Sequence, residues 1–182
     1  MTKLRVTITQ VITLIVTLLV LSACSSQYPN QTLVGQTFPQ VNGETLTKQK
    51  VVLPQHFNNQ TTILLIGYVQ DSQFDIDRWL IALDMTEVTT PVFELPTIKG
   101  MLPRMFETTI NNGMRKGIPK ELWQGVITIY QDGDKIQRLT GNQNPNNARV
   151  VLLNRDNNIV YFYDRGFSVS ALNELRTQID KN

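Results

Sequence analysis

The stretch that decides the fold is residues 61–80, TTILLIGYVQDSQFDIDRWL. Its first nine residues, Thr61 to Val69, form an unbroken run of apolar, β-branched and aromatic side chains, which is typical of a strand buried on both faces at the centre of a sheet. Ser72 and Asp75 then have the spacing of a capping box at a helix start. Apolar residues follow at helical intervals, namely Ile76, Trp79, Leu80 and Leu83. A buried strand followed at once by a capped amphipathic helix predicts the opening of a βαβ unit.

Beyond this unit the pattern predicts a second strand and a second helix. Pro91 to Leu95 is the expected strand, and the helix is expected to begin near Pro103, whose missing N–H costs little in a first turn. Asn112-Gly113 is expected to end this helix. The side chains expected to face inward are Met105, Phe106, Thr109 and Ile110. Met114 to Gly125 is then predicted to be a mid-chain insertion, with one helical turn around Leu122-Trp123.

The last third of the chain predicts two strand pairs and a closing helix. Val126 to Tyr130 is expected to pair with Lys135 to Thr140 across Asp132-Gly133, and Arg149 to Leu153 with Ile159 to Tyr163. Ser168 is expected to cap the closing helix. The apolar stripe of that helix is Leu172, Leu175 and Ile179.

Towards the N-terminus, short apolar pieces are interrupted by turn-forming residues, which favours an irregular hairpin over a helix. These interruptions are Gly35, Phe38-Pro39, Asn42-Gly43 and Leu53-Pro54. The polar residues 24–32 lack periodicity and contain Pro29, so they are predicted to form a short tether, with the domain occupying residues 33–182.

The order of elements from Thr61 onward is similar to the thioredoxin fold. The similarity rests on Thr61 to Trp79 and on residues 150–176, VVLLNRDNNIVYFYDRGFSVSALNELR, which resemble the final strand-turn-strand-helix of membrane-tethered thioredoxins and peroxiredoxins. Upstream counterparts of the family pattern are Gly35, Phe38-Pro39, Gly43 and Leu46. The resemblance implies an α/β, three-layer fold, in which helices flank a central mixed sheet, with an N-terminal hairpin and a mid-chain insertion.

The sequence departs from that family at the residues that carry its chemistry. Redox members place a Cys-x-x-Cys where the central strand meets the first helix, because the helix N-terminus lowers the thiol pKa; here the matching positions hold Ser72 and Asp75. The family's cis-proline position is matched by Ala148, where a cis bond is not expected. The resemblance therefore implies a redox-inactive domain that lacks the residues for peroxidase, copper-delivery and glutathione chemistry.

The first 24 residues resemble the signal segment of a bacterial lipoprotein. Lys3 and Arg5 precede an apolar stretch from Val6 to Leu21, which is shorter and more polar than a membrane-spanning helix requires. The junction Leu21-Ser22-Ala23-Cys24 looks like a lipobox. In that family the signal, here residues 1–23, is removed, and Cys24 carries diacylglycerol and usually an amide-linked acyl chain such as palmitate, which together hold a protein firmly on a membrane. The alternative is an ordinary signal peptide with a chance cysteine.

The residue after Cys24 and the overall composition limit the expected cellular location and the expected partners. Ser25 after the cysteine favours the periplasmic face of the outer membrane in a Gram-negative host, whereas a Gram-positive host would leave the domain outside the cytoplasmic membrane. The expected signal contains two of the 17 basic residues and none of the 15 acidic ones. The remaining charges balance, so no basic stripe points to nucleic acid. Cys24 is the only cysteine, so lipidation would leave neither a thiol nor a disulfide.

Five residues are candidates for a ligand or partner surface. Asp71, Ser72, Asp75 and Arg149 are expected to meet where thioredoxins have their active site, although acids at a helix start and an arginine that pairs with them also make an ordinary structural arrangement. Arg115 lies in a short basic turn, residues 114–119, which either contacts an anionic group or partner protein or is an ordinary solvated loop. No cofactor or metal motif is present, and the single histidine, His56, lies in an expected turn.

Three functions remain open from the sequence. The first is a non-enzymatic envelope lipoprotein that binds or assists another envelope component. The second is a thiol-independent enzyme that reuses the thioredoxin-site position. The third is a structural surface lipoprotein without a defined ligand.

Overall fold

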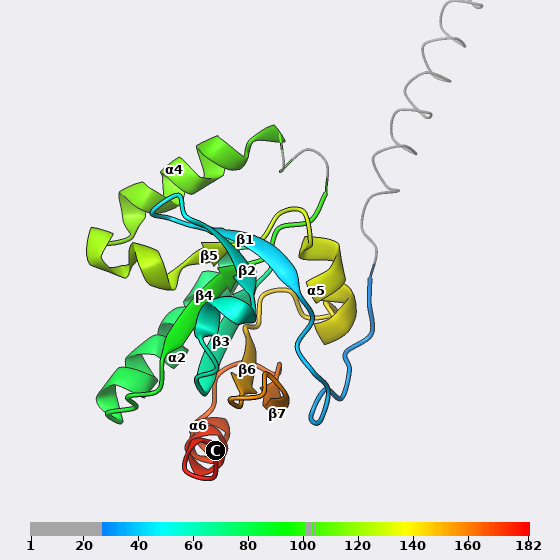
Figure 1. Ribbon diagram of the computed structural model, residues 1–182, viewed down its shortest axis with the longest axis vertical. Coiled ribbons are helices and arrows are strands. Elements are labelled where there is room, and N and C mark those ends of the chain that lie inside the picture. The colour runs from blue at the N-terminus through cyan, green and yellow to red at the C-terminus, as the bar shows by residue number, and fades with distance from the viewer. Residues whose placement is uncertain (1–26, 101–102, 104) are drawn as a thin grey trace, which may run out of the picture.

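The computed structural model describes residues 27–100, 103 and 105–182 (Figure 1). The expected signal segment and Cys24 lie outside these residues. The main sheet has the strand order β4-β3-β6-β7, in which β3 is parallel to β4 and antiparallel to β6, and β6 is antiparallel to β7. Its strands are β3 (Thr62–Gly67), β4 (Val92–Pro96), β6 (Arg149–Leu153) and β7 (Ile159–Tyr163).

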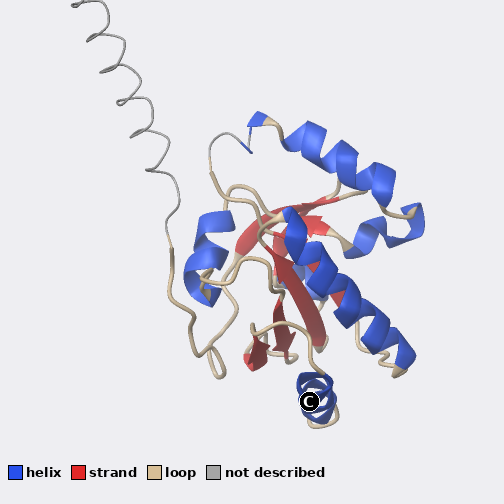
Figure 2. Cartoon of the chain, turned by 180° about the vertical axis from the view of Figure 1, so that it is seen from behind, coloured by secondary structure: helices blue, strands red, loops and turns tan. Residues whose placement is uncertain are grey.

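The central strand and the first helix form where residues 61–80 predict them. All six residues of β3 are buried, and β3 lies inside the sheet between β4 and β6. The short 3₁₀ helix η2 (Gln70–Ser72) leads directly into α2 (Gln73–Met85). Helix α2 turns Ile76, Trp79 and Leu83 into a core that it shares with one face of β3 and β6 and with α6 (Val169–Ile179). Figure 2 shows α2 crossing in front of the sheet in the view from behind.

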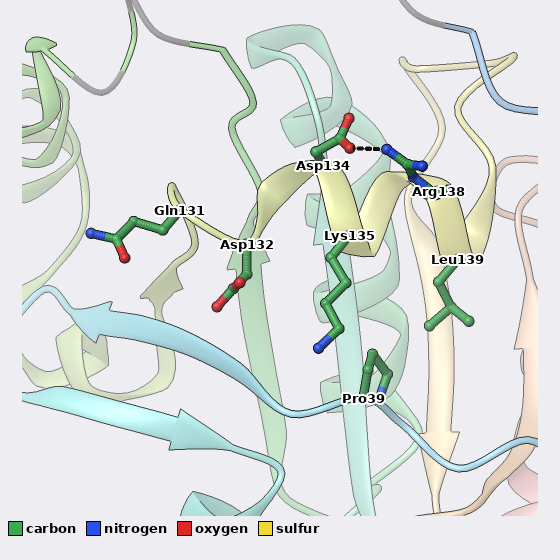
Figure 3. A pocket seen from close by; sticks show the side chains of 7 residues that line it. All are labelled: Pro39, Gln131, Asp132, Asp134, Lys135, Arg138 and Leu139. Atoms are coloured by element: carbon green, nitrogen blue, oxygen red, sulfur yellow. Dashed lines mark hydrogen bonds and ion pairs between the residues drawn. The ribbon is translucent and has the colours of Figure 1, made fainter.

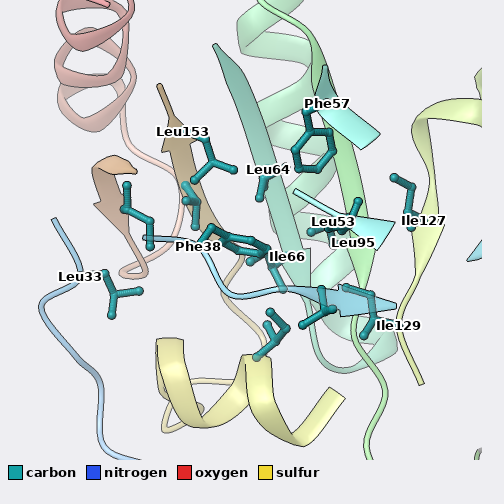
Figure 4. Packing of buried hydrophobic residues seen from close by; sticks show 14 of the residues in the cluster. Leu33, Phe38, Leu53, Phe57, Leu64, Ile66, Leu95, Ile127, Ile129 and Leu153 are labelled. Carbon is teal, nitrogen blue, oxygen red and sulfur yellow. The ribbon is translucent and has the colours of Figure 1, made fainter. Parts of the chain in front are cut away.

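The predicted N-terminal hairpin covers the opposite face of the main sheet. Strands β1 (Val41–Thr45) and β2 (Lys50–Leu53) pair in antiparallel register, and β5 (Ile127–Thr128) joins the other edge of β1. Parallel bridges flanking β5, Glu94–Val126 and Thr97–Ile129, attach this smaller sheet to the β4 side. Leu53, Ile127 and Leu64 meet in the core between the sheets (Figure 4). The molecule therefore has the three layers that the sequence predicted.

The segment before β1 is bound to the far edge of the main sheet. Gly35 N–H donates to the Ile159 carbonyl at 2.8 Å, Ile159 N–H donates to the Gln36 carbonyl at 2.8 Å, and Phe38 N–H donates to the Asn157 carbonyl at 2.9 Å. Leu33 and Phe38 are buried in the core beneath the hairpin (Figure 4). The N-terminal part of the domain thus depends on contacts with the turn before β7.

Lys135 to Thr140 is helical, and its prediction as a strand is wrong. Helix α5 (Gly133–Thr140) buries Ile136, Gln137 and Thr140, a spacing that matches one helical face. Ile136 contacts the same core as the hairpin. Asp132-Gly133 therefore begins a helix rather than a hairpin turn.

The mid-chain insertion consists of α4 (Glu107–Gly117) and the 3₁₀ helix η3 (Lys120–Gly125). Helix α4 continues through Asn112-Gly113, so the predicted end of the helix is wrong. Met105 and Phe106 are 72% and 57% exposed, and Thr109 is exposed as well, so three of the four predicted inward residues face solvent. The buried anchor of α4 is Asn111, whose Oδ1 accepts a hydrogen bond from the Tyr130 hydroxyl at 3.0 Å.

The closing helix begins where the sequence predicted. Ser168 has extended backbone angles, and its Oγ accepts from the Ala171 N–H at 3.1 Å, as an N-cap does. Helix α6 buries Ala171, Leu172 and Leu175. Three aromatic rings from different segments pack beneath it, because Trp79 makes edge contacts with Tyr163 and Phe167 at centroid distances of 5.9 and 5.3 Å.

Candidate functional site

The start of α2 is fastened to two distant segments by one buried carboxylate. Asp75 Oδ2 accepts a hydrogen bond from the Ala148 N–H at 2.8 Å, and Asp75 Oδ1 accepts one from the Phe167 N–H at 2.7 Å. We call this arrangement of Asp75, Ala148 and Phe167 the Asp75 junction. It joins α2, the entry to β6 and the entry to α6. A proline at position 148 would have no N–H to donate, so the alanine there is matched to the carboxylate.

Ser72 does not complete the predicted capping box. Its backbone is helical (φ −65°, ψ −17°), its side chain makes no cap hydrogen bond, and its Oγ instead donates to the Val69 carbonyl at 2.6 Å. Gly67 is required at the end of β3, because a Cβ there would lie 2.5 Å from the Ser72 Oγ. The capping-box prediction is therefore wrong for both members, since Ser72 closes the preceding 3₁₀ turn and Asp75 bonds to other segments. Asp71 is exposed on η2.

Arg149 lies on the other face of the sheet from these residues. Side chains alternate along β6, so that Val150 and Leu152 contact the α2 side while Arg149 points toward Tyr68 and the hairpin side. Its Nη1 donates to the Asn144 and Asn147 carbonyls at 2.6 and 2.7 Å. Among the described residues Arg149 forms no ion pair with Asp71 or Asp75, so the expected convergence of the three does not occur.

The Arg149 guanidinium is fully buried against an aromatic ring. It lies 4.6 Å from the centroid of the Tyr68 ring, and burial lowers its pKa. Burial also raises the pKa of Tyr68 to about 12, and the Tyr68 hydroxyl hydrogen-bonds to Thr140 Oγ1. Two guanidinium nitrogens, Nε and Nη2, have no hydrogen-bond partner in the part of the chain that the structure describes.

Arg115 fastens the insertion to the hairpin instead of presenting a basic turn. It lies in the last turn of α4, where its Nε donates to the Leu46 carbonyl at 2.6 Å and its Nη1 donates to Asn112 Oδ1 at 2.8 Å. Its Nη2 lies 3.9 Å from Glu44 Oε1, and only 11% of the side chain is exposed. Residues 114–117 are thus helical, and the charge of Arg115 is directed into the domain. His56 lies in the 3₁₀ helix η1 (Gln55–Phe57), where its ring packs against the rings of Phe57 and of Phe93 in β4.

A cluster that the sequence did not reveal surrounds Tyr28, in the segment predicted to be a tether. The Tyr28 hydroxyl donates to Asp134 Oδ1 at 2.6 Å, and its ring lies 4.7 Å from Lys99 Nζ and 5.3 Å from Arg138 Cζ. Its backbone pairs with Asn142, whose Oδ1 accepts from the Tyr28 N–H at 2.7 Å and whose N–H donates to the Tyr28 carbonyl at 3.0 Å. We call these contacts the Tyr28 clamp.

Asp134 and Arg138 of the Tyr28 clamp also line an open pocket of about 580 Å³ on the outer face of α5. Figure 3 shows the side chains that line this pocket. Asp134 and Arg138 lie one helical turn apart in this face, with Asp134 Oδ2 accepting from Arg138 Nη2 at 2.6 Å. The Tyr28 hydroxyl and then Arg138 hold the pKa of Asp134 below its ordinary value. The remaining lining residues are Pro39, Gln131, Asp132, Lys135 and Leu139.

Exposed apolar side chains surround the Asp75 junction. Val69 precedes η2, Phe74 adjoins Asp75, and Val169 follows the turn that Asp75 holds, with exposed fractions of 43%, 71% and 65%. The contacts of Ser72 with Val69 and of Asp75 with Phe167 bring these three segments to one end of the main sheet. Three exposed apolar side chains therefore lie on segments that these hydrogen bonds bring together.

The described residues contain neither a cluster of metal-ligating side chains nor a helix suited to cross a membrane. No group of three or more histidine, cysteine, aspartate or glutamate side chains is placed there to hold a metal ion. None of the helices in residues 27–100, 103 and 105–182 combines the length and apolar character that a membrane crossing needs.

The fold and the site define a thioredoxin-like domain whose sequence contains no pair of cysteines. No protein-family model matches the sequence, and no curated protein is similar to it in sequence. The structure resembles the thiol peroxidase from Chromobacterium violaceum with a TM-score of 0.56 and 11% identity, over 86% of this chain and 92% of that one. It resembles copper-bound ScoI of Arabidopsis thaliana with a TM-score of 0.55 and 14% identity, over 79% and 98% of the two chains.

A third solved structure is an exposed lipoprotein thioredoxin, Etrx1 of Streptococcus pneumoniae. Its TM-score is 0.52 at 8% identity, and the match covers 78% of this chain and 99% of that one. At these identities the likeness shows a shared fold, which confirms the fold class expected from the sequence.

Proposed function

We propose that this protein is a lipid-anchored component of the bacterial envelope whose thioredoxin-like domain binds another envelope protein without thiol chemistry. The observation that carries the proposal is the Asp75 junction. Where the resembling redox family has its second cysteine, the carboxylate of Asp75 accepts two backbone N–H groups that hold three segments together. Because the Asp75 carboxylate is bound to two backbone N–H groups, it stabilises the fold. The exposed side chains next to it remain free to contact a partner.

The proposed binding surface is the apolar end of the sheet formed by Val69, Phe74 and Val169. When a partner buries exposed apolar groups, the free energy of the system falls by about 25 cal/mol per Å² of buried area. Large exposed aromatic side chains are frequent anchors of protein interfaces. Phe74 is the aromatic member of this surface, so it is the expected centre of contact.

The proposed address is the outer membrane, facing the periplasm of a Gram-negative host. Its support is the sequence Leu21-Ser22-Ala23-Cys24 followed by Ser25. Etrx1, an exposed lipoprotein thioredoxin, gives one precedent for a lipoprotein domain of this fold.

Mass spectrometry of the protein purified from its own membranes tests the anchor. We expect an N-terminal peptide beginning at Cys24 that carries the mass of diacylglycerol and an acyl chain, and we expect Cys24→Ser to abolish it. A chain that still begins at Met1, or a Cys24 thiol that reacts with maleimide, contradicts the anchor.

Site-specific photo-crosslinking in cells tests the binding surface. A photoreactive amino acid at position 74 should give a discrete crosslinked product with one envelope protein, and the same amino acid at exposed Asn173 on α6 serves as the matched control. Crosslinks of equal yield at both positions, or none at position 74, contradict a partner site at this end of the sheet.

A thiol-independent enzyme is the second candidate, and one observation favours it. Arg149 keeps two buried nitrogens without partners near the end of the same sheet. Arg149→Met should then remove the function of the protein in cells. Because the change also removes two hydrogen bonds to backbone carbonyls, function is compared at a temperature at which circular dichroism shows that the variant is still folded. Retention of the phenotype in this variant rejects the enzyme hypothesis.

A further inference from the structure

The segment just after the expected lipidation site is bound to the folded domain at Tyr28. Both polar groups of the Tyr28 backbone are bound by Asn142, and its hydroxyl is bound by Asp134. The cations of Lys99 and Arg138 both lie within cation–π distance of its ring. Asp134 and Asn142, which are 106 and 114 positions away in the sequence, therefore hold Tyr28 at its hydroxyl and at its backbone.

Gly141 is fitted to the same segment. Its φ of +75° is one that side-chain-bearing residues rarely adopt, and a Cβ on it would lie 2.5 Å from the Asn30 Cα and 2.6 Å from the Pro29 carbonyl oxygen. The backbone of residues 29–30 therefore crosses directly over Gly141. Only glycine permits this close approach, so the sequence of the domain at position 141 is matched to the bound position of residues 29–30.

The clamp sets how far the domain can lie from an anchor at Cys24. Four Cα-to-Cα steps separate Cys24 from Tyr28, so even a fully extended chain spans at most about 14 Å. A tether that stayed unbound as far as Leu33 would have nine steps and would reach about 32 Å. With the clamp closed, the face that carries Tyr28 must stay within a short distance of the bilayer.

We propose that the Tyr28 clamp docks the outer face of α5 on the lipid headgroups of the membrane that holds the anchor. The inference rests on the proposed lipid anchor and deepens it, because it specifies which face of the domain meets the bilayer. On this face Lys135 donates to the Gln40 carbonyl, and Arg138 pairs with Asp134, so the charges are balanced locally. Such paired, amphipathic side chains beside the half-buried Leu139 suit the polar and apolar boundary of a bilayer whose headgroups are mostly zwitterionic.

Fluorescence quenching on reconstituted protein tests the orientation. The full lipidated protein is placed in vesicles of phosphatidylethanolamine and phosphatidylglycerol that contain a lipid with a nitroxide headgroup. A fluorophore is attached to Gln131→Cys, beside the α5 pocket, or to Asn173→Cys on α6; lipidated Cys24 does not compete for the label. We expect quenching at position 131 to exceed that at position 173 several-fold.

Variants of the clamp separate docking from anchoring. In Tyr28→Ala the ratio of quenching at the two positions should fall towards one, while in Gln31→Ala, an exposed residue of the same segment, it should stay at the parent value. Circular dichroism and urea midpoints establish that both variants are folded. A ratio near one in the parent, or a ratio that Tyr28→Ala leaves unchanged, overturns the docking proposal.

Mass spectrometry of the same samples distinguishes the two proposals. A sample in which Cys24 carries lipid but the quenching ratio is near one contradicts the docking alone. A sample in which Cys24 carries no lipid contradicts the anchor, and the docking fails with it.

Discussion

The carboxylate of Asp75 accepts a hydrogen bond from the backbone N–H of Ala148, 73 residues further along the chain, at 2.8 Å. This contact joins the N-terminal turn of α2 to the residue that precedes β6. The second oxygen of Asp75 accepts from Phe167, so one side chain determines how three segments meet.

Asp75→Ala should destabilise the domain strongly. The change leaves the Ala148 and Phe167 N–H groups without their acceptor, and each such loss costs about 1–3 kcal/mol. We expect the free energy of unfolding, measured by urea titration, to fall by about 3 kcal/mol. The matched control is Asp77→Ala on the exposed face of α2, which should change it by less than about 0.5 kcal/mol. Equal effects of the two changes would show that the Asp75 junction contributes little.

Gly141→Ala should displace the N-terminal segment from its seat. The added Cβ has no space against Asn30, and the positive φ adds strain, so we expect a loss of about 1–3 kcal/mol in unfolding free energy. Hydrogen exchange at the Asn142 amide, which donates to Tyr28, should accelerate. Gly113→Ala in α4 is the control, because a Cβ there meets no atom within 4 Å. That change should stabilise the chain by up to about 1 kcal/mol, and a destabilisation of similar size at both positions would contradict this account.

Glu94→Gln should stabilise the protein at neutral pH. Burial, followed by the charge of Asp77, raises the pKa of Glu94 in the folded chain. A raised carboxyl pKa favours folding below the ordinary pKa, and that contribution is lost as the pH rises through the folded value. The urea midpoint of the variant should therefore exceed that of the parent at neutral pH and approach it as the pH falls towards the ordinary glutamate value. Glu121→Gln, at an exposed position in η3, should show no such pH-dependent difference.

Ser168→Ala should weaken the start of α6. It removes the acceptor for the Ala171 N–H, and the loss of an N-cap costs about 1 kcal/mol. The thermal midpoint should fall by several degrees, as a change of that size does in a domain of ordinary length. Ser170→Ala, two residues later and exposed, removes only a contact with Glu174 at 3.3 Å. If the two variants melt at the same temperature, Ser168 is not the cap that fixes this helix.

The predictions from sequence succeeded where burial dictated the pattern. The apolar run from Thr61 to Val69 contains the central strand β3, which is buried from water on both faces. The apolar stripe of α2 then packs against one face of that strand. Lys135 to Thr140 was misread because six residues with two apolar positions fit both a short strand and a helix. The geometry of Asp132-Gly133, which decides between them, depends on contacts with the hairpin, since Asp132 Oδ2 accepts from Asn42.

The candidate site was only partly visible in the sequence. Asp75 is one of the candidate positions that the sequence indicates, but its partners are backbone N–H groups, which no side-chain pattern reveals. The thioredoxin resemblance predicts that Arg149 approaches Asp75 across the neighbouring loop, but the alternation of β6 places its side chain on the opposite face of the sheet. The Tyr28 clamp joins residues more than 100 positions apart, and its available signal was a tyrosine in a polar stretch together with the helical spacing of Asp134 and Arg138.

The pairing of residues 35–38 with residues 157–159 determines when the domain can close during synthesis. A ribosome makes the first of these segments long before the second, so Leu33 and Phe38 have no completed core to enter until most of the chain has emerged. Contacts between distant segments form late in this way. The growing polypeptide therefore stays open almost to its end, and an open polypeptide can be threaded through a narrow protein channel that a closed domain would block.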